Sequence, residues 1–323
     1  MTEQPTVPLT AEAKAPEAPT ADPKAPEALT ADPKAPEALT AEAKAEVLVE
    51  ALPYIRRFRG QVLVIKYGGN AMGDSNEAAE LAHFAEDVVM LHAVGIRVVV
   101  VHGGGPQIGA LMERLGKETA FIDGLRVTDA ETLDIARMVL VGKVNRDIVG
   151  AIGSRGAVAV GLSGEDAGLL RAAPRSAALG FVGDVTSVDT DIIDRLLAED
   201  VVPVIATIGS DDAGQSYNIN ADTAAGAIAE ALCAEKLVYL TNIEGLRSDV
   251  NDARSLLSAV TADQLDDLVT SGAITTGMIP KVASCSRAVR AGVGHAHILD
   301  GRVPHVLLLE IFTNSGIGTM VSA

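Results

Sequence analysis

The feature of this sequence that most restricts its fold is a run of four apolar residues, 62–65, that ends at Lys66 and is followed by Gly68 and Gly69. Such a run is typical of a strand buried on both faces of a parallel sheet. Glycines let backbone N–H groups approach a ligand closely, and a lysine adds positive charge. The segment therefore predicts an anion site at the end of a buried strand, although a lysine in this place can also be simply solvated.

A second apolar strand, predicted over residues 96–101, ends at His102 and three consecutive glycines, 103–105. Pro106 then falls in the first turn of the next helix, where its missing N–H is not needed. An esterase oxyanion motif would also require Gly-x-Ser-x-Gly, which the sequence lacks. A dinucleotide fingerprint would require glycine at Ile108, and no Walker A loop is present. The glycines are therefore interpreted as an anion-binding nest at a helix N-terminus, with a tight turn as the alternative.

Beyond residue 61, predicted strands and helices alternate. The pattern indicates an α/β fold with a mainly parallel sheet between two layers of helices. Ligands bind beyond the carboxyl ends of the strands in such sheets, so Lys66 and both glycine segments are expected at one edge. Pro203 predicts an edge position or a distortion for its strand. Helices are expected at 75–94 (capped by Ser75), within 129–155, at 221–234 and at 280–291, and strands at 157–162, 180–188, 201–208, 237–241, 296–299 and 305–312.

The composition limits the possible partners. A net charge of −17 and an aromatic content of 3% argue against a nucleic-acid partner, because phosphate binding favours a basic face. No apolar run is long enough to span a membrane, and no signal-peptide core is visible near the N-terminus. The isolated cysteines Cys233 and Cys285 suit a reducing compartment. We therefore expect a cytoplasmic protein that binds neither nucleic acid nor membrane.

The N-terminal segment is distinct from the rest. A decapeptide rich in Ala, Pro, Glu and Lys recurs from Thr10, Thr20, Thr30 and Thr40, and residues 1–44 are expected to be disordered because they bury too little apolar surface. An amphipathic helix is predicted at 45–59, with a kink at Pro53. Its apolar face needs a partner surface, either on its own domain or on a neighbouring subunit.

Three further charged residues have both a functional and an ordinary interpretation. Arg126 lies in a predicted loop, where its guanidinium could pair with a carboxylate or remain on the surface. Asp222 stands near the start of an Ala-rich helix, as a simple cap or as a partner for lysines. Lys281 falls in the first turn of a helix, where a cation is slightly unfavourable, which favours an anion-binding role. Together with Lys66 and the glycines, they form a coherent set for phosphoryl transfer without a P-loop.

This combination resembles the amino-acid kinase family over residues 46–323. Five segments occur in the family's order: Lys66–Met72, Val101–Ile108, Gly124–Thr128, Asn218–Asp222 and Gly277–Lys281. The resemblance implies a three-layer αβα sandwich with two lobes, an acceptor-binding lobe at 60–233 and an ATP-binding lobe at 234–323. It is greatest to the members that use ATP with Mg²⁺, the metal being held mainly by the phosphates, to phosphorylate the side-chain carboxylate of N-acetyl-L-glutamate in arginine biosynthesis.

The resemblance also implies roles for individual residues. Lys66 and Lys281 would stabilise the transferring phosphoryl group, and Asp222 would hold both lysines. The other implied contacts are Gly68 and Gly69 with the nucleotide phosphates, Thr241, Glu244 and Gly245 with the nucleotide, Gly104 and Gly105 with the acceptor carboxylate, and Arg126 and Asn218 with the rest of the acceptor. Asn242 and Thr276 depart from the family's usual Asp and Gly, which affects nucleotide contacts and loop flexibility rather than the catalytic charges.

Regulation follows from the same likeness. Arginine-inhibited members resemble this chain in the N-terminal helix and in a C-terminal segment where His297, Glu310 and Gly316 would line an L-arginine site. We therefore expect feedback inhibition by L-arginine and a homo-oligomer, a hexamer built as a trimer of dimers and linked through the helix. The alternatives are a kinase of the same fold acting on aspartate, glutamate, carbamate or UMP, and a non-catalytic arginine-binding regulator, which would not need both lysines and Asp222.

Overall fold

The computed structural model describes residues 39–68, 77–249, 252, 254–272, 274, 278–313 and 317–323. Predictions for Gly69, the cap Ser75, Thr276, Gly277 and Gly316 lie outside these residues. Contacts divide the chain into Met1–Glu46 and Val47–Ala323. The described part of the first unit contains the beginning of helix α1 (Ala41–Phe58), and the second unit holds the rest of the fold.

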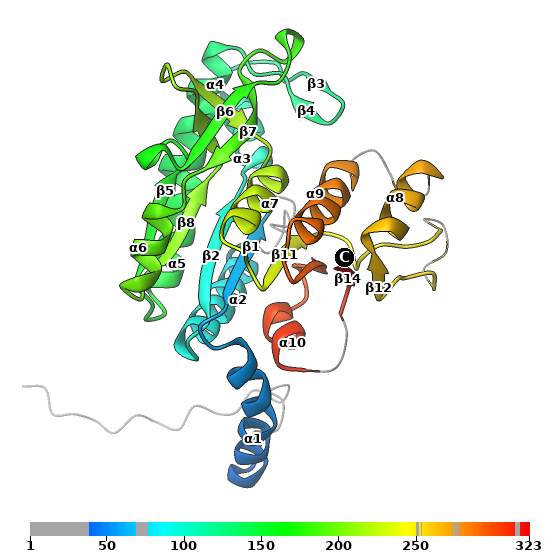
Figure 1. Ribbon diagram of the computed structural model, residues 1–323. Coiled ribbons are helices and arrows are strands. Elements are labelled where there is room, and N and C mark those ends of the chain that lie inside the picture. The colour runs from blue at the N-terminus through cyan, green and yellow to red at the C-terminus, as the bar shows by residue number, and fades with distance from the viewer. Residues whose placement is uncertain are drawn as a thin grey trace, which may run out of the picture. The chain divides into compact units, whose positions relative to one another are not determined.

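The core of the second unit is an eight-stranded sheet (Figure 1). Its strands are parallel except at one edge, where β14 pairs antiparallel with β13 and parallel with β12. The predicted mainly parallel α/β sheet is therefore confirmed. The strands, in spatial order, are β12 (Ala259–Thr261), β14 (Thr319–Ser322), β13 (His295–Asp300), β11 (Lys236–Thr241), β1 (Val62–Tyr67), β2 (Arg97–His102), β8 (Val202–Ala206) and β5 (Ala159–Ser163).

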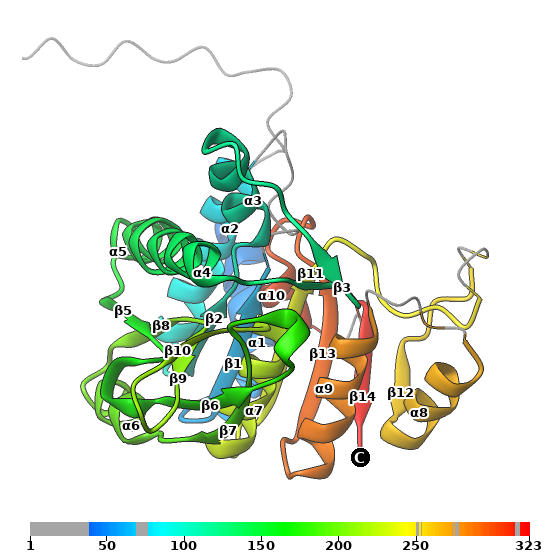
Figure 2. The same cartoon turned by 90° about the horizontal axis from the view of Figure 1, so that it is seen from above.

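Helices cover both faces of this sheet (Figure 2). Successive side chains of a strand point to opposite faces, so Leu63 and Ile65 pack into one apolar core and Val64 into the other. One layer contains α2 (Glu77–Ala93), α3 (Gly105–Arg114), α4 (Ala130–Arg137), α5 (Asn145–Gly153) and α10 (Val306–Phe312). The opposite layer contains α6 (Asp191–Ala198), α7 (Ala221–Ala231), α8 (Ala262–Thr270) and α9 (Ile279–Arg290).

Smaller elements are added to the three layers. Four short strands close into a barrel: β6 (Leu170–Pro174), β7 (Val182–Val188), β9 (Ile208–Ser210) and β10 (Ser216–Ile219). A hairpin is formed by β3 (Phe121–Ile122) and β4 (Leu125–Arg126). A π-helical segment, η1 (Met138–Val144), joins α4 to α5, and single 3₁₀ turns occur at η2 (Asp166–Gly168) and η3 (Ala177–Leu179).

One local prediction is wrong, and one of the two alternatives of a second prediction is excluded. Residues 305–312 were expected to form a strand, but Val306–Phe312 is helix α10, because a short buried apolar run has no periodicity that separates strand from helix. Pro203 does not mark an edge, since β8 lies between β2 and β5. The N–H of Val202 donates to the carbonyl oxygen of Val158, the residue before β5, so the missing N–H of Pro203 would point to the opposite side, toward β2. The pairing of β8 with β2 begins only at Val204, one residue after the proline.

The boundary of the N-terminal helix also differs from the prediction. Helix α1 begins at Ala41, inside the fourth decapeptide, rather than at residue 45, and it continues through Pro53 to Phe58. Phe58 is buried in the core, whereas Val47, Leu48, Val49 and Leu52 are each at least 40% exposed. The central sheet crosses the expected lobe boundary at 233/234 without interruption, because β11 pairs directly with β1.

Candidate active site

The carboxyl ends of β1 and β2 form one wall of a cavity of about 490 Å³. Tyr67 pairs with His102 in the sheet register, so the residues after both strands lie side by side. Lys66, Gly68 and the glycines 103–105 all line the cavity, as predicted from the two strand ends.

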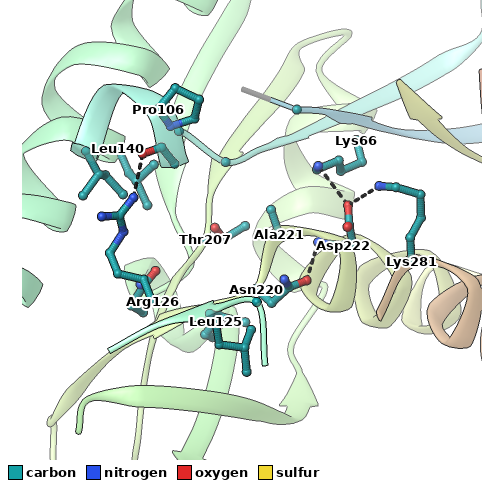
Figure 3. Close-up of a pocket in the computed structure, with 18 of the residues that line it drawn as sticks. Lys66, Pro106, Leu125, Arg126, Leu140, Thr207, Asn220, Ala221, Asp222 and Lys281 are labelled. Carbon is teal, nitrogen blue, oxygen red and sulfur yellow. Dashed lines mark hydrogen bonds and ion pairs between the residues drawn. The ribbon is translucent and has the colours of Figure 1, made fainter. Parts of the chain in front are cut away.

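Asp222 joins two lysines at one end of the cavity (Figure 3). Its Oδ1 atom lies 2.8 Å from Nζ of Lys66 and 2.9 Å from Nζ of Lys281. Figure 3 shows the lysines approaching the carboxylate from different elements, Lys66 from β1 and Lys281 from α9. Two residues that are far apart in the sequence therefore present their positive charges to one space.

The electrostatics of this group are determined by its burial and by its two positive charges and one negative charge. Burial alone would raise the pKa of Asp222, but the ammonium groups of Lys66 and Lys281 outweigh it and hold the pKa of this carboxyl below its usual range. Burial, and then repulsion from Lys66, lower the pKa of Lys281. With two cations and one carboxylate, the group suits a polyanionic ligand.

Helix α7 positions Asp222 through its cap and its packing against α9. The Asn220 side chain accepts hydrogen bonds from the N–H groups of Asp222 (2.9 Å) and Thr223 (3.1 Å). A Cβ atom at Gly226 would overlap the Ser284 hydroxyl of α9, so the glycine permits close helix packing. Ser284 also donates to the Asp222 carbonyl oxygen at 3.0 Å, which ties the two helices together beside the lysines.

Arg126 lies away from the lysines in Figure 3, and Gly104, Gly105 and Asn218 also line the cavity. Arg126 Nη2 donates to the Gly105 carbonyl oxygen at 2.8 Å, and its guanidinium lies 4.9 Å from the centre of the Phe121 ring. Figure 3 shows the side chain beside Pro106 and Leu140. Asn218 donates to the Thr128 hydroxyl at 3.3 Å. The cavity thus combines the start of α3 with a guanidinium, both suited to a carboxylate.

The predicted nucleotide residues divide into two groups. Gly68 and Thr241 line the cavity, but Glu244 and Gly245 are not among its described lining residues. Glu244 instead lies 3.1 Å from Arg247, and a Cβ atom at Gly245 would come within 2.8 Å of the Thr319 hydroxyl. Gly69 lies outside the described residues.

Of the predicted regulatory residues, His297 and Glu310 lie together, and Gly316 is outside the described residues. Lys236 Nζ is 2.8 Å from Glu310 Oε1 and 3.1 Å from His297 Nε2, and His297 Nδ1 is 3.0 Å from Glu310. Burial, then the charge of Lys236, lower the pKa of His297 to about 2, so the ring is neutral. The Lys236 ammonium also lies 5.4 Å from the centre of the Phe58 ring, at the end of α1.

Sequence reasoning missed several cavity residues. They are the apolar or neutral side chains of Phe121, Leu125, Leu140, Thr207 and Asn220. Outside the cavity, Lys236 of the regulatory cluster was also missed. Asn220 carried a usable signal, since Asn before a helix is a favoured cap. The others did not, because their place depends on the hairpin, the π-helical segment and strand pairing.

The fold and the cavity define the class of protein. Paired lysines on a carboxylate, in one cavity with a glycine-rich helix start and an arginine, fit an enzyme that brings two anions together, as phosphoryl transfer requires. The sequence matches the Amino acid kinase family over residues 61–300, and the chain belongs to this family.

Comparison with individual proteins is consistent with this assignment. The chain is 54% identical to the acetylglutamate kinase of Symbiobacterium thermophilum (86% of this chain, 97% of the relative) and 51% identical to that of Halorhodospira halophila (86% and 95%). Its structure resembles N-acetylglutamate synthase from Neisseria gonorrhoeae complexed with coenzyme A and N-acetyl-glutamate, with a TM-score of 0.76 and 27% identity. The match covers 86% of this chain but 63% of the synthase, which has also been solved with coenzyme A and L-arginine (TM-score 0.75).

No helix among the described residues is both long and apolar enough to cross a membrane. Within the same residues, no group of three or more His, Cys, Asp and Glu side chains is placed to hold a metal ion.

Proposed function

We propose that this chain is an ATP-dependent kinase that phosphorylates the side-chain carboxylate of N-acetyl-L-glutamate. The products are N-acetyl-L-glutamyl 5-phosphate and ADP, and the reaction serves arginine biosynthesis. The observation that carries the proposal is the pairing of Lys66 and Lys281 on Asp222 in the same cavity as Gly104 and Arg126. Relatives above 50% identity that match nearly end to end support the choice of acceptor.

The reaction needs little acid–base chemistry. The acceptor carboxylate is already ionised at neutral pH, so no general base is required. One of its oxygens forms a bond to the γ-phosphorus as the bond from that phosphorus to the β–γ bridging oxygen breaks, and ADP leaves with the electron pair. The main obstacle is repulsion between two anions, which Lys66 and Lys281 reduce by neutralising the charge on the phosphoryl oxygens.

ATP enters this scheme as its magnesium complex, with the metal held mainly by the phosphates. The described residues that fit the phosphate end are Gly68, where backbone can approach closely, and the two lysines. Thr241 also lines the cavity, and it follows Leu240, the sheet partner of Tyr67. Gly69, Glu244 and Gly245 remain proposed nucleotide residues on the strength of the family resemblance, as does the division into an acceptor lobe (60–233) and a nucleotide lobe (234–323).

The acceptor fits the part of the cavity that contains Arg126. Backbone N–H groups of Gly104 and Gly105 would bind the reacting carboxylate at the start of α3. Arg126 would pair with the α-carboxylate, and Asn218 would bind near the N-acetyl group. The guanidinium is already held by the Gly105 carbonyl, which reduces the entropy lost when substrate binds.

A coupled assay of ADP release tests the acceptor. We expect ATP turnover with N-acetyl-L-glutamate and a kcat/KM about a hundredfold lower, or less, with glutamate or aspartate. A site that hydrogen-bonds the N-acetyl group discriminates strongly against compounds without that group. Comparable or faster turnover with glutamate, aspartate, carbamate or UMP would assign a different acceptor. Absence of turnover with all of them, together with arginine binding, would favour the non-catalytic regulator.

Regulation by L-arginine is the second part of the proposal. His297 and Glu310 would bind the inhibitor with Gly316, and Lys236, which bonds both described side chains, would respond to it. The contact of Lys236 with Phe58 links this cluster to α1. The exposed apolar residues of α1 would join subunits into a hexamer, a trimer of dimers, so inhibitor binding and assembly would share one helix.

A further inference from the structure

His102 is buried directly behind the glycine segment and is not among the described residues that line the cavity. Its Nδ1 atom lies 3.0 Å from the carbonyl oxygen of Gly103. Its Nε2 atom lies 3.1 Å from the side-chain nitrogen of Asn145. The imidazole therefore connects the first residue of α5 with the backbone of the predicted nest.

The surroundings of Asn145 determine which imidazole nitrogen carries the proton. Asn145 Nδ2 donates to the Val204 carbonyl oxygen at 2.8 Å, and a carbonyl oxygen only accepts hydrogen bonds. The same amide nitrogen faces Nε2 of His102, so Nε2 must be the acceptor and the proton must be on Nδ1. Nδ1–H then donates to the Gly103 carbonyl oxygen. Arg146 bonds the Asn145 side-chain oxygen and fixes the amide in this orientation.

Peptide geometry carries this orientation into the cavity. In a trans peptide the C=O and the following N–H point in opposite directions. Because the Gly103 carbonyl bonds the buried His102, which is not among the described lining residues, the N–H of Gly104 points away from His102. This N–H belongs to the start of α3, where the first amides have no acceptor within the helix.

Packing also restricts the same peptide. A Cβ atom at Gly104 would lie 2.8 Å from Leu140 and 3.1 Å from Val144, both in the π-helical segment that leads into Asn145. One continuous segment therefore touches Gly104 by packing and His102 by hydrogen bonding. π-Helical insertions occur often at functional sites because they change the face that following residues present.

We propose that His102 is a positioning residue, which holds the Gly103–Gly104 peptide with its N–H toward the acceptor carboxylate, and that Asn145 selects the imidazole tautomer that does so. This role rests on the proposed function for its ligand, but the tautomer itself does not. Burial is the main reason that the pKa of His102 is lowered to about 4, with Arg146 the charged group acting on it, so the neutral form persists through the physiological range.

The first experiment measures the tautomer of the ligand-free protein. Nitrogen NMR of histidine-labelled full-length protein should show His102, assigned by the signal lost in His102→Asn, with its proton on Nδ1 from pH 6 to 8. A proton on Nε2, or an imidazolium in this range, would overturn the proposal. This measurement does not depend on any activity.

The second experiment separates positioning from packing. His102→Leu removes the donor, while Asn at this position places an amide nitrogen near the place of Nδ1 and should restore it. We expect His102→Leu to raise the KM for N-acetyl-L-glutamate about fivefold, since one hydrogen bond contributes on the order of 1 kcal/mol. His102→Asn should recover most of this loss, and the KM for ATP should change less than about twofold in both variants.

His92→Leu is the matched control, because His92 bonds the Asp200 carbonyl and is not among the described cavity residues. Equal KM values for His102→Leu and His102→Asn would overturn the positioning role.

If His102→Leu does not fold, the variant Asn145→Asp provides the test. The carboxylate of this variant would accept a hydrogen bond from Nε2–H of His102 and so hold a proton on Nε2. As pH rises, His102 would lose its proton from Nδ1, and activity should fall. A pH profile identical to that of wild type would contradict the proposal. If the wild-type protein forms no ADP, the proposed function is refuted. The NMR measurement of the His102 tautomer tests the further inference independently of that result.

Discussion

At the scale of single residues, the central feature is one carboxylate oxygen shared by two ammonium groups. Asp222 Oδ1 lies within 2.9 Å of both lysines, so each cation is held near the other despite their repulsion. In the proposed reaction, the shared carboxylate would keep the lysines in place before any phosphate arrives, which would lower the reorganisation needed in the transition state.

Replacing Lys281 by Met tests this arrangement. We expect kcat to fall about 10²–10³-fold, because one preorganised charge on the transferring group is removed. The KM for N-acetyl-L-glutamate should change little, since Arg126 lies away from the lysines in Figure 3. Steady-state kinetics measure both constants, with Lys44→Met on α1 as the matched control. A kcat within threefold of wild type would contradict a catalytic role for Lys281.

The sequence was informative about the chemistry at this scale. Lys66, Asp222, Lys281 and glycines 103–105 stand out because they adjoin recognisable strand or helix ends, and the structure brings them to one cavity. Leu140 and Phe121 could not be found in the same way, because an apolar side chain looks alike in a core and in a cavity wall. The tautomer of His102 depends on Asn145, which neither spacing nor hydropathy connects to it.

At the scale of elements, α10 differs from the expected strand and has an unusual start. His305 precedes it in the left-handed region, with φ of 56°, and the helix is capped by a residue far away in the sequence. Asp87 of α2 accepts hydrogen bonds from the His305 ring (2.7 Å) and from the Leu307 N–H (3.3 Å). His83 and Glu86 of α2 lie beside the same imidazole. Long-range capping of this kind leaves no local sequence signal, which explains why the helix was missed.

Asp87→Asn tests the electrostatics of this cap. Burial raises the pKa of Asp87 to about 6, so its contribution to folding is greatest at low pH, where the folded carboxyl is neutral, and is lost as pH rises through 6. Asn does not titrate, so the free energy of unfolding of wild type relative to the variant should decrease by up to about 3 kcal/mol between pH 4 and pH 8. Urea unfolding at several pH values measures this difference.

The matched control for this measurement is Asp200→Asn, which removes one carboxylate that is 87% exposed. The relative stability of this control should vary with pH much less than that of Asp87→Asn. A difference between wild type and Asp87→Asn that does not change with pH would contradict the role assigned to burial.

At the scale of the whole molecule, α1 combines a buried end with an exposed apolar face. Phe58 is buried against the core and contacts Lys236, whereas Leu48 is 63% exposed. The repeats predicted a change in character near residue 45, but the helix begins at Ala41 because Ala, Glu and Lys in the last decapeptide are good helix formers once proline is absent.

Removing residues 1–58 should therefore reduce the size of the assembly and weaken inhibition by L-arginine, while removal of 1–38 should change neither. Because the larger deletion also removes buried Phe58, the double variant Leu48→Glu, Leu52→Glu tests the exposed face alone. Light scattering gives the assembly size, and ADP release against arginine concentration gives the inhibition. Identical inhibition curves for all four proteins would exclude a regulatory role for α1.

The packing of α7 on α9 has a consequence for how this enzyme could change during evolution. Gly226 faces Ser284 where a single added methyl group would not fit, and this contact holds the helices that carry Asp222 and Lys281. The distance between Asp222 and Lys281 therefore depends on a contact whose residues are not among the described lining of the cavity. In the proposed enzyme, a mutation at Gly226 or Ser284 would change the turnover rate without altering any residue that contacts a substrate.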